Sequence, residues 1–184
     1  MKSPANTTVA IFAGGKSSRF GSVKSHALIN GKEFGARIID TLKIGGFTEI
    51  FLVGGEPEDA ERWGVKFLHD LYFESGPLGA LITAMRFCET NILMTLPCDV
   101  PYIDAESCKV LSDLSDPFDV RVAITDSPQW LCSTWRTSIV ESLEAEFLIG
   151  ERSIHKVIEE LKVEYVEISN DVLLNINEPS QLKS

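Results

Sequence analysis

The chain has 184 residues, 44% of them hydrophobic, and a formal net charge of −10 at pH 7. A chain of this size and composition is expected to form a single globular domain, residues 1–184, that buries roughly two thirds of its unfolded surface. The acidic charge argues against general binding to nucleic acid or to an anionic membrane, because both depend on cation-rich surfaces. There is no apolar run of the ~18 residues that a membrane span needs. Residues 1–8 also lack the apolar core of a secretory signal, so we expect a cytoplasmic protein.

The first part of the chain alternates between predicted strands and predicted helices. Short apolar runs predict the strands, and apolar residues at helical spacing predict the helices. The strands are expected at 8–12, 49–53, 65–68 and 91–96, and the helices at 33–44, 57–63, 76–88 and 104–114. Such alternation predicts βαβ units, and therefore an α/β fold with a mostly parallel sheet and helices on both faces.

The remaining segments are predicted to extend this sheet, and they contain no repeat, low-complexity segment or linker. Further strands are expected at 119–125, 130–135 and 163–168, further helices at 137–147, 152–161 and near 179, and a short extended piece with an Asn-Gly turn at 27–32. The turn is predicted because Asn-Gly suits a tight hairpin connection.

The loop after the first predicted strand carries the clearest chemical signal. The strand ends at Phe12, the adjacent Gly14 and Gly15 follow, and three cations then occur within nine residues, Arg19 and Lys24 among them. Glycines let backbone N–H groups approach an anion closely, and cations supply the charge that a phosphate needs. The segment therefore predicts a phosphate-binding loop. The simpler alternative is a basic surface turn.

Two better-known phosphate-binding patterns do not fit this loop. A P-loop needs a glycine five residues before its Gly-Lys-Ser, where this chain has Ala10. The dinucleotide pattern G-x-G-x-x-G also fails, because the glycines stand at positions 14, 15 and 21. A different phosphate-binding arrangement is therefore expected.

Two aspartates follow predicted strands and are candidates for chemistry at the same edge of the sheet. Open α/β sheets bind ligands beyond the carboxyl ends of their strands, where Asp70 and Asp99 are expected. Mg²⁺ binds through one or two carboxylates together with substrate phosphates, so Asp99 is the candidate magnesium ligand. Asp104 is placed to cap the next helix, which leaves Asp99 available for this role. For Asp70, a simple turn carboxylate is an equally good interpretation.

The cysteines, histidines and tryptophans give weaker signals. The four cysteines contain no C-x-x-C pair, so buried thiols are favoured over a zinc site. The three histidines have no metal-ligand spacing and are interpreted as surface or core residues. Trp130 and Trp135 are interpreted as packing residues.

Taken in their order, the motifs resemble those of the molybdenum cofactor guanylyltransferases over nearly the whole chain. The matching segments are 12–21 (FAGGKSSRFG), 76–79 (GPLG), 96–102 (LPCDVPY), 150–152 (GER) and 175–179 (NINEP). The resemblance implies a three-layer Rossmann-like nucleotidyltransferase domain with Mg²⁺ as its cofactor. The implied reaction transfers GMP from GTP to the phosphate of molybdopterin and releases pyrophosphate. Transient contacts with other proteins of molybdenum cofactor biosynthesis are implied as well.

On the nucleotide side, the resemblance implies roles for residues of the glycine-rich loop. The backbone of Phe12, Ala13 and Gly14 would line the guanine and sugar pocket. Gly15 and Arg19 would hold the triphosphate.

At the reacting phosphates, the resemblance implies that Lys24 neutralises charge and that Asp99 holds Mg²⁺. The implied catalytic residues are therefore Arg19, Lys24 and Asp99. On the acceptor side, Arg152, Asn175 and Asn177 would face the pterin.

The chain departs from the family pattern in a way that bears on nucleotide choice. Gly54 stands where the family often has asparagine, so a polar contact to the base or ribose is expected to be missing, although Gly54 and Asp70 would still lie against the nucleotide. Val23 replaces an acid that often precedes the lysine, and Trp130 replaces a proline. The alternatives are CTP in place of GTP, a sugar phosphate as acceptor, or a non-catalytic carrier of a nucleotide or pterin.

Overall fold

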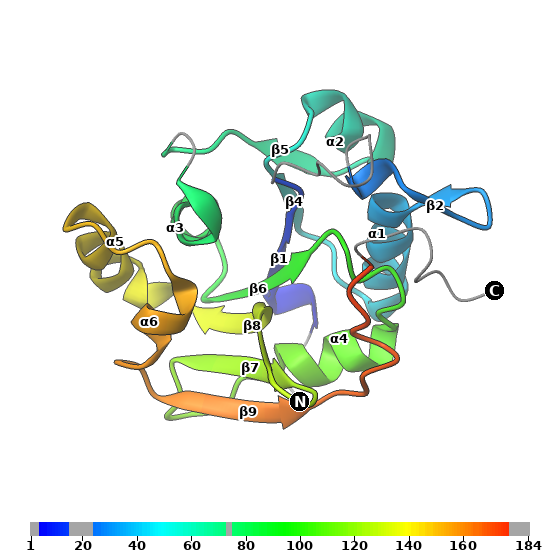
Figure 1. Cartoon of the computed structure of the whole chain (residues 1–184). Helices are drawn as coiled ribbons and strands as arrows, with labels where there is room; N and C mark the ends of the chain where they lie inside the picture. Colours follow the sequence, from blue (N-terminus) through cyan, green and yellow to red (C-terminus); the bar gives the residue numbers. More distant parts are fainter. Residues whose placement is uncertain (1–3, 15–23, 73–74, 177–184) are drawn as a thin grey trace.

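The structure is a computed structural model that describes residues 4–14, 24–72 and 75–176. The strands of its main sheet are β1 (Thr8–Phe12), β4 (Ile50–Val53), β5 (Lys66–Leu68), β6 (Ile92–Pro97), β7 (Val120–Ile124), β8 (Pro128–Arg136) and β9 (Val163–Glu167). Within the described residues they form a seven-stranded sheet in the order β5-β4-β1-β6-β8-β7-β9 (Figure 1). Only β8 among these strands is antiparallel to its neighbours. The mostly parallel sheet expected from the sequence is confirmed.

Helices cover both faces of this sheet, which gives the three layers of an α/β fold (Figure 1). They are α1 (Phe34–Gly45), α2 (Pro57–Trp63), α3 (Gly76–Phe87), α4 (Ala105–Ser112), α5 (Val140–Leu148) and α6 (Ile154–Ile158). Apolar residues of α1, α2 and α4 pack on one face, and those of α3, α5 and α6 pack on the other. Within the described residues, no helix combines the length and the apolar character needed to cross a membrane.

The central strand β1 shows why the sequence folds in this way. Its side chains alternate between the two faces, so Val9 and Ile11 pack with α1 and α4, while Ala10 and Phe12 pack with α3. All five residues of β1 are buried. A strand that is covered on both faces needs a continuous apolar run, and this is the pattern that the sequence shows at this position.

A short hairpin connects the glycine-rich loop to α1. It consists of β2 (Leu28–Ile29) and β3 (Lys32–Glu33) and follows η2 (Lys24–His26), a single 3₁₀ turn. Asn30 and Gly31 adopt φ values of 51° and 76°, as the predicted Asn-Gly turn requires. The other short 3₁₀ segments are η1 (Pro4–Asn6) and η3 (Thr137–Ile139).

The predicted helices agree with the structure except near residues 137–161. The first of the two helices predicted there begins with the 3₁₀ turn η3 before α5. The second begins two residues later than expected, because the carboxylate of Glu151 accepts hydrogen bonds from the amides of Arg152 and Ser153 outside the helix, and it ends at Ile158. Asp104 caps α4 as expected, by accepting a hydrogen bond of 2.7 Å from the amide of Ser107. The helix expected near residue 179 lies outside the described residues.

Candidate functional site

The loop after β1 lies between the loops that follow β4 and β6. The amide of Ala13 donates to the carbonyl of Val53 at 3.0 Å, and the amide of Cys98 donates to the carbonyl of Phe12 at 3.1 Å. Phe12 and Ala13 are buried, whereas Gly14 is exposed. The first glycine of the motif therefore emerges from the sheet edge between two other loops that carry candidate residues.

The contact between Gly54 and Gly14 is closer than any side chain would allow. Gly54 has a φ of +72°, and a Cβ atom added to it would lie 2.9 Å from the nitrogen of Gly14 and 3.0 Å from its Cα. Gly54 is expected to lack a polar contact to the base or ribose, and this close approach adds a steric reason for glycine at the position. The position requires glycine because the backbones of the two loops touch there.

Asp99 occupies the loop after β6, beside the glycine-rich loop. It is half-buried, and its neighbours Cys98 and Val100 are buried. The pKa of the Cys132 thiol on β8 is raised chiefly by burial and further by the negative charge of Asp99. Asp99 thus sits at the sheet edge, with part of its environment formed by the buried core.

A segment from the C-terminal part of the chain lies against the same loop. The amide of Ile176 donates to the carbonyl of Asp99 at 2.9 Å, and the Ile176 side chain is fully buried against Phe34 and Ile29. Figure 1 shows this segment crossing beside the loop after β6. The neighbouring Asn175 is exposed. The structure therefore brings Asn175 and Asp99 together, although they are 76 positions apart in the sequence.

Asp70 lies after the edge strand β5, which is separated from β1 by β4. Asp70 is exposed, yet partial desolvation raises the pKa of its carboxyl above the ordinary value.

Arg152 follows α5, on the face of the sheet that α3, α5 and α6 cover. Its guanidinium stacks 4.0 Å from the ring centroid of Phe147 and donates to the carbonyls of Phe147 and Glu151 at 2.6 and 2.7 Å. The Tyr72 ring packs against the same Phe147 ring at 4.6 Å, and its hydroxyl donates to Glu144 at 2.5 Å. The loop of Asp70 and the segment of Arg152 are therefore joined through aromatic packing. No local sequence pattern relates Tyr72 to Phe147, so their contact is visible only in the structure.

Several expected site residues fall outside the described part of the chain. They are Gly15, Arg19 and Asn177, and the side chain of Lys24 is also not described. The backbone of Lys24 begins the 3₁₀ turn η2.

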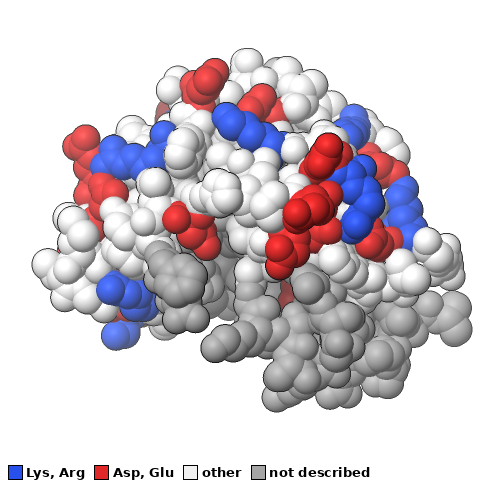
Figure 2. Space-filling model, turned by 90° about the horizontal axis from the view of Figure 1, so that it is seen from above, with Lys and Arg blue, Asp and Glu red and all other residues white. Residues whose placement is uncertain are grey.

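Figure 2 shows the molecule from above the view of Figure 1, and on the described part of this surface charges of both signs are interspersed. Arg62 forms ion pairs with Glu33 and Asp59, and Arg86 pairs with Glu144. These cations join elements of the fold to one another.

The cysteine, histidine and tryptophan side chains of the described residues bear on metal binding and on packing of the core. Within the described part of the chain, no group of three or more His, Cys, Asp or Glu side chains is arranged to hold a metal ion. Cys98, Cys108 and Cys132 are buried, which confirms the expectation of buried thiols for these three, while Cys88 is partly exposed. Trp135 is fully buried, as its interpretation as a packing residue requires.

Comparison with known proteins gives consistent results. The family model described as the MobA-like NTP transferase domain matches residues 9–165. The chain is 28% identical over 180 residues to the "probable molybdenum cofactor guanylyltransferase" of Aquifex aeolicus, covering 96% of this chain and 88% of that protein. It is 26% identical over 187 residues to the molybdenum cofactor guanylyltransferase of Vibrio vulnificus, covering 99% and 96%.

Solved structures share the fold. A crystal structure of a protein from Aquifex aeolicus superimposes with a TM-score of 0.80 and 27% identity, covering 95% of this chain and 94% of that one. The molybdopterin-guanine dinucleotide biosynthesis protein A of Archaeoglobus fulgidus superimposes with a TM-score of 0.78 over the same shares, at 23% identity.

Proposed function

Because the chain belongs to the MobA-like NTP transferase domain family, we propose that it transfers GMP from GTP to the terminal phosphate of molybdopterin and releases pyrophosphate. The names of its relatives from Aquifex aeolicus and Vibrio vulnificus support the choice of these substrates. In the structure, the supporting observation is the meeting of the loops after β1, β4 and β6 at one sheet edge.

The nucleotide is proposed to bind over the loop after β1. Phe12, Ala13 and Gly14 present backbone groups there, and Gly15 and Arg19 are assigned to the triphosphate. Backbone groups held by neighbouring strands are fixed before the ligand arrives, so little ordering remains to oppose binding. Gly54 supports the loop by its direct backbone contact with Gly14.

Asp99 fits the requirements of a magnesium ligand. It is a half-buried carboxylate beside the glycine-rich loop, and Mg²⁺ prefers oxygen ligands from one or two carboxylates with substrate phosphates filling other positions. When bound, Mg²⁺ would neutralise charge on the phosphates. Lys24, at the other end of the glycine-rich loop in the sequence, is assigned to neutralise charge on the same phosphates.

The protein's own contribution is positioning and electrostatic stabilisation. The acceptor phosphate is already ionised at neutral pH, so its attack on the α-phosphorus needs no general base. Holding the two substrates in line and offsetting the negative charge are the remaining tasks. Arg152, Asn175 and Asn177 are assigned to the acceptor, and the contact between Ile176 and Asp99 places that segment beside the proposed metal ligand.

Pyrophosphate release in the presence of GTP, Mg²⁺ and molybdopterin tests the proposal directly. A carrier would bind these ligands without releasing pyrophosphate, and that result would refute transfer. Omitting molybdopterin should abolish release, and a sugar phosphate in its place tests the alternative acceptor. GTP should be preferred to CTP and ATP in competition, and a preference for CTP would refute the guanylyl assignment while leaving nucleotidyl transfer intact.

Two substitutions test the assigned residues. Lys24→Ala should lower kcat by about 10²–10³-fold, as the loss of a group that stabilises transition-state charge does. Asp99→Asn should abolish the magnesium dependence of GTP binding, which can be measured without turnover. Asp116→Asn is the matched control, because Asp116 precedes β7 at the opposite edge of the sheet and is 85% exposed. Near wild-type turnover in Lys24→Ala, or unchanged magnesium dependence in Asp99→Asn, would show that the role lies elsewhere.

A further inference from the structure

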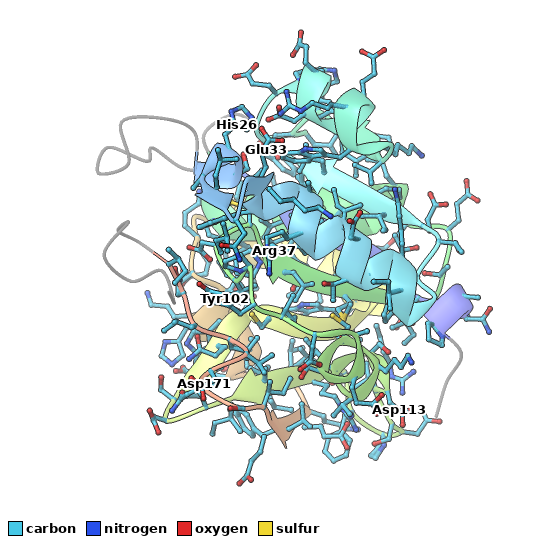
Figure 3. All side chains as sticks on the ribbon, turned by 90° about the vertical axis from the view of Figure 1, so that its right-hand side faces the viewer. His26, Glu33, Arg37, Tyr102, Asp113 and Asp171 are labelled. Carbon is cyan, nitrogen blue, oxygen red and sulfur yellow. The ribbon has the colours of Figure 1, made fainter. Side chains whose placement is uncertain are left out.

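A cluster of polar side chains with a buried aspartate at its centre lies beside the turn that carries Lys24. Its five members, which we call the α2 clamp, come from η2, from the end of β3 and from α2; they are His26, Glu33, Asp59, Arg62 and Trp63. Figure 3 shows His26 and Glu33 next to each other below α2, with Arg37 farther along α1. None of these residues belongs to the motifs from which the function was inferred.

Asp59 is the centre of the α2 clamp. Only 2% of its side chain is exposed, and both carboxylate oxygens are engaged. Oδ2 lies 2.6 Å from Nε2 of His26, and Oδ1 lies 2.7 Å from a guanidinium nitrogen of Arg62. Because an ionised carboxylate can only accept hydrogen bonds, Nε2 of His26 is the donor. A buried carboxylate is costly unless it is bonded in this way, so the arrangement restrains both donors.

The other hydrogen bonds of the α2 clamp join α2 to Glu33, the residue that precedes α1. The indole nitrogen of Trp63 donates to Glu33 at 2.9 Å, and Arg62 donates to the same carboxylate at 3.0 Å. The Trp63 ring also fits closely over Gly35, where an added Cβ would lie 2.4 Å from the ring. Two side-chain contacts join η2 to the α2 clamp in the described part of the chain. One is the hydrogen bond between His26 and Asp59, and the other is an edge-to-face contact of the His26 and Trp63 rings, whose centroids lie 6.3 Å apart.

The turn held by this bond begins with Lys24. Lys24 and His26 are the two ends of the single 3₁₀ turn η2, and Ser25 between them is fully buried. The next residue, Ala27, accepts a hydrogen bond of 3.0 Å from the amide of Phe34 at the start of α1. The chain is therefore anchored within three residues of Lys24, on the side that leads away from the glycine-rich loop.

We propose that His26 and Asp59 are positioning residues that fix the backbone of Lys24 relative to the reacting phosphates. This inference rests on the proposed function, in which Lys24 acts on those phosphates. A displacement of about 1 Å at a reacting centre can cost about 10²-fold in rate, so a cation at the end of a long loop needs a rigid anchor. The buried hydrogen bond between His26 and Asp59 supplies that anchor from a helix that is remote in the sequence.

Three variants separate positioning from general stability. His26→Ala removes the bond to Asp59, and we expect kcat to fall about tenfold or more while KM for GTP changes little. His26→Gln keeps an N–H donor at a similar reach and should restore most of the lost kcat. Trp63→Phe keeps an aromatic ring beside His26 but removes the N–H donor to Glu33, so it should lower thermal stability and leave kcat near the wild-type value. A kcat of His26→Ala equal to that of Trp63→Phe would overturn the proposal.

Hydrogen exchange of residues 24–27, measured by mass spectrometry on the same proteins, gives a readout independent of activity. His26→Ala should speed exchange in this segment about tenfold, whereas Trp63→Phe should leave it near the wild-type rate. If wild-type protein releases no pyrophosphate, the proposed function fails, and exchange still decides whether the anchor exists. Unchanged exchange in His26→Ala would refute the anchor even if the wild type is an active transferase.

Discussion

Replacing Gly54 by alanine should weaken both the fold and GTP binding, because the added methyl group meets the backbone of Gly14. Gly54 adopts a φ of +72°, and its added Cβ would lie 2.9 Å from the Gly14 nitrogen. Gly31 provides a matched control, since its φ is +76° but an added Cβ there has no atom within 4 Å. The two substitutions share the backbone strain and differ in the close contact.

The structure allows the two costs to be separated. A non-glycine residue in the left-handed region costs about 1–2 kcal/mol, which is the whole effect expected for Gly31→Ala. Overpacking costs typically about 1–3 kcal/mol more, so Gly54→Ala should lose about 2–5 kcal/mol of the free energy of unfolding. The shift that relieves this contact must move either the loop after β1 or the loop after β4. GTP affinity should therefore fall for Gly54→Ala and stay unchanged for Gly31→Ala.

Urea denaturation measures the first difference, and titration with Mg²⁺-GTP measures the second. Equal losses of stability in both variants, with equal GTP affinity, would refute the reasoning, because only Gly54 touches the candidate site. Gly54→Asn separates the backbone strain from the close contact. Asparagine tolerates positive φ better than alanine does, so any recovery relative to alanine reports the strain, while a remaining loss reports contact with Gly14.

Two further predictions concern ionisable groups away from the glycine-rich loop. A hydrogen bond from Arg121, with a smaller contribution from Ser115, lowers the pKa of Glu164, so this pair stabilises the protein above the unfolded-state pKa of about 4.3. Glu164→Gln should therefore cost about 1 kcal/mol near pH 7, and the difference from wild type should shrink as pH falls through the lowered pKa; a difference that stays constant as pH falls from 7 to well below the unfolded-state pKa would contradict this. Burial raises the pKa of Cys108 to about 12, so at pH 8 a thiol reagent should modify Cys88 in the native protein and reach Cys108 only after unfolding; rapid labelling of all four thiols would contradict the buried positions.

The sequence predicts the layers of this fold well because local patterns carry that information. The apolar runs at 8–12 and 91–96 and the helical spacing at 33–44 correspond to β1, β6 and α1. Strand bounds differ from the expected ones by at most two residues. The late start of α6 was not predicted, because the hydrogen bonds from the amides of Arg152 and Ser153 to Glu151 depend on a loop conformation that no periodicity encodes.

The candidate site is predicted only in part from the sequence. The motifs identify the loop containing Gly14 and the loop containing Asp99, because glycine and carboxylate chemistry is readable from residue type and order. They do not reveal that Gly54 must be glycine, since this depends on a backbone contact across 40 positions of the sequence. From the sequence, His26 is interpreted only as a surface or core residue.

The sequence by itself thus determined the fold class, the order of its elements and the chemical character of the loop after β1. The tertiary structure alone decided which residues meet: Gly54 with Gly14, Ile176 with Asp99, and His26 with Asp59. The physical reason is that backbone propensity and apolar periodicity act over a few residues. Contacts between loops arise only when the parallel sheet brings its strand ends to one edge, and no local pattern records that placement.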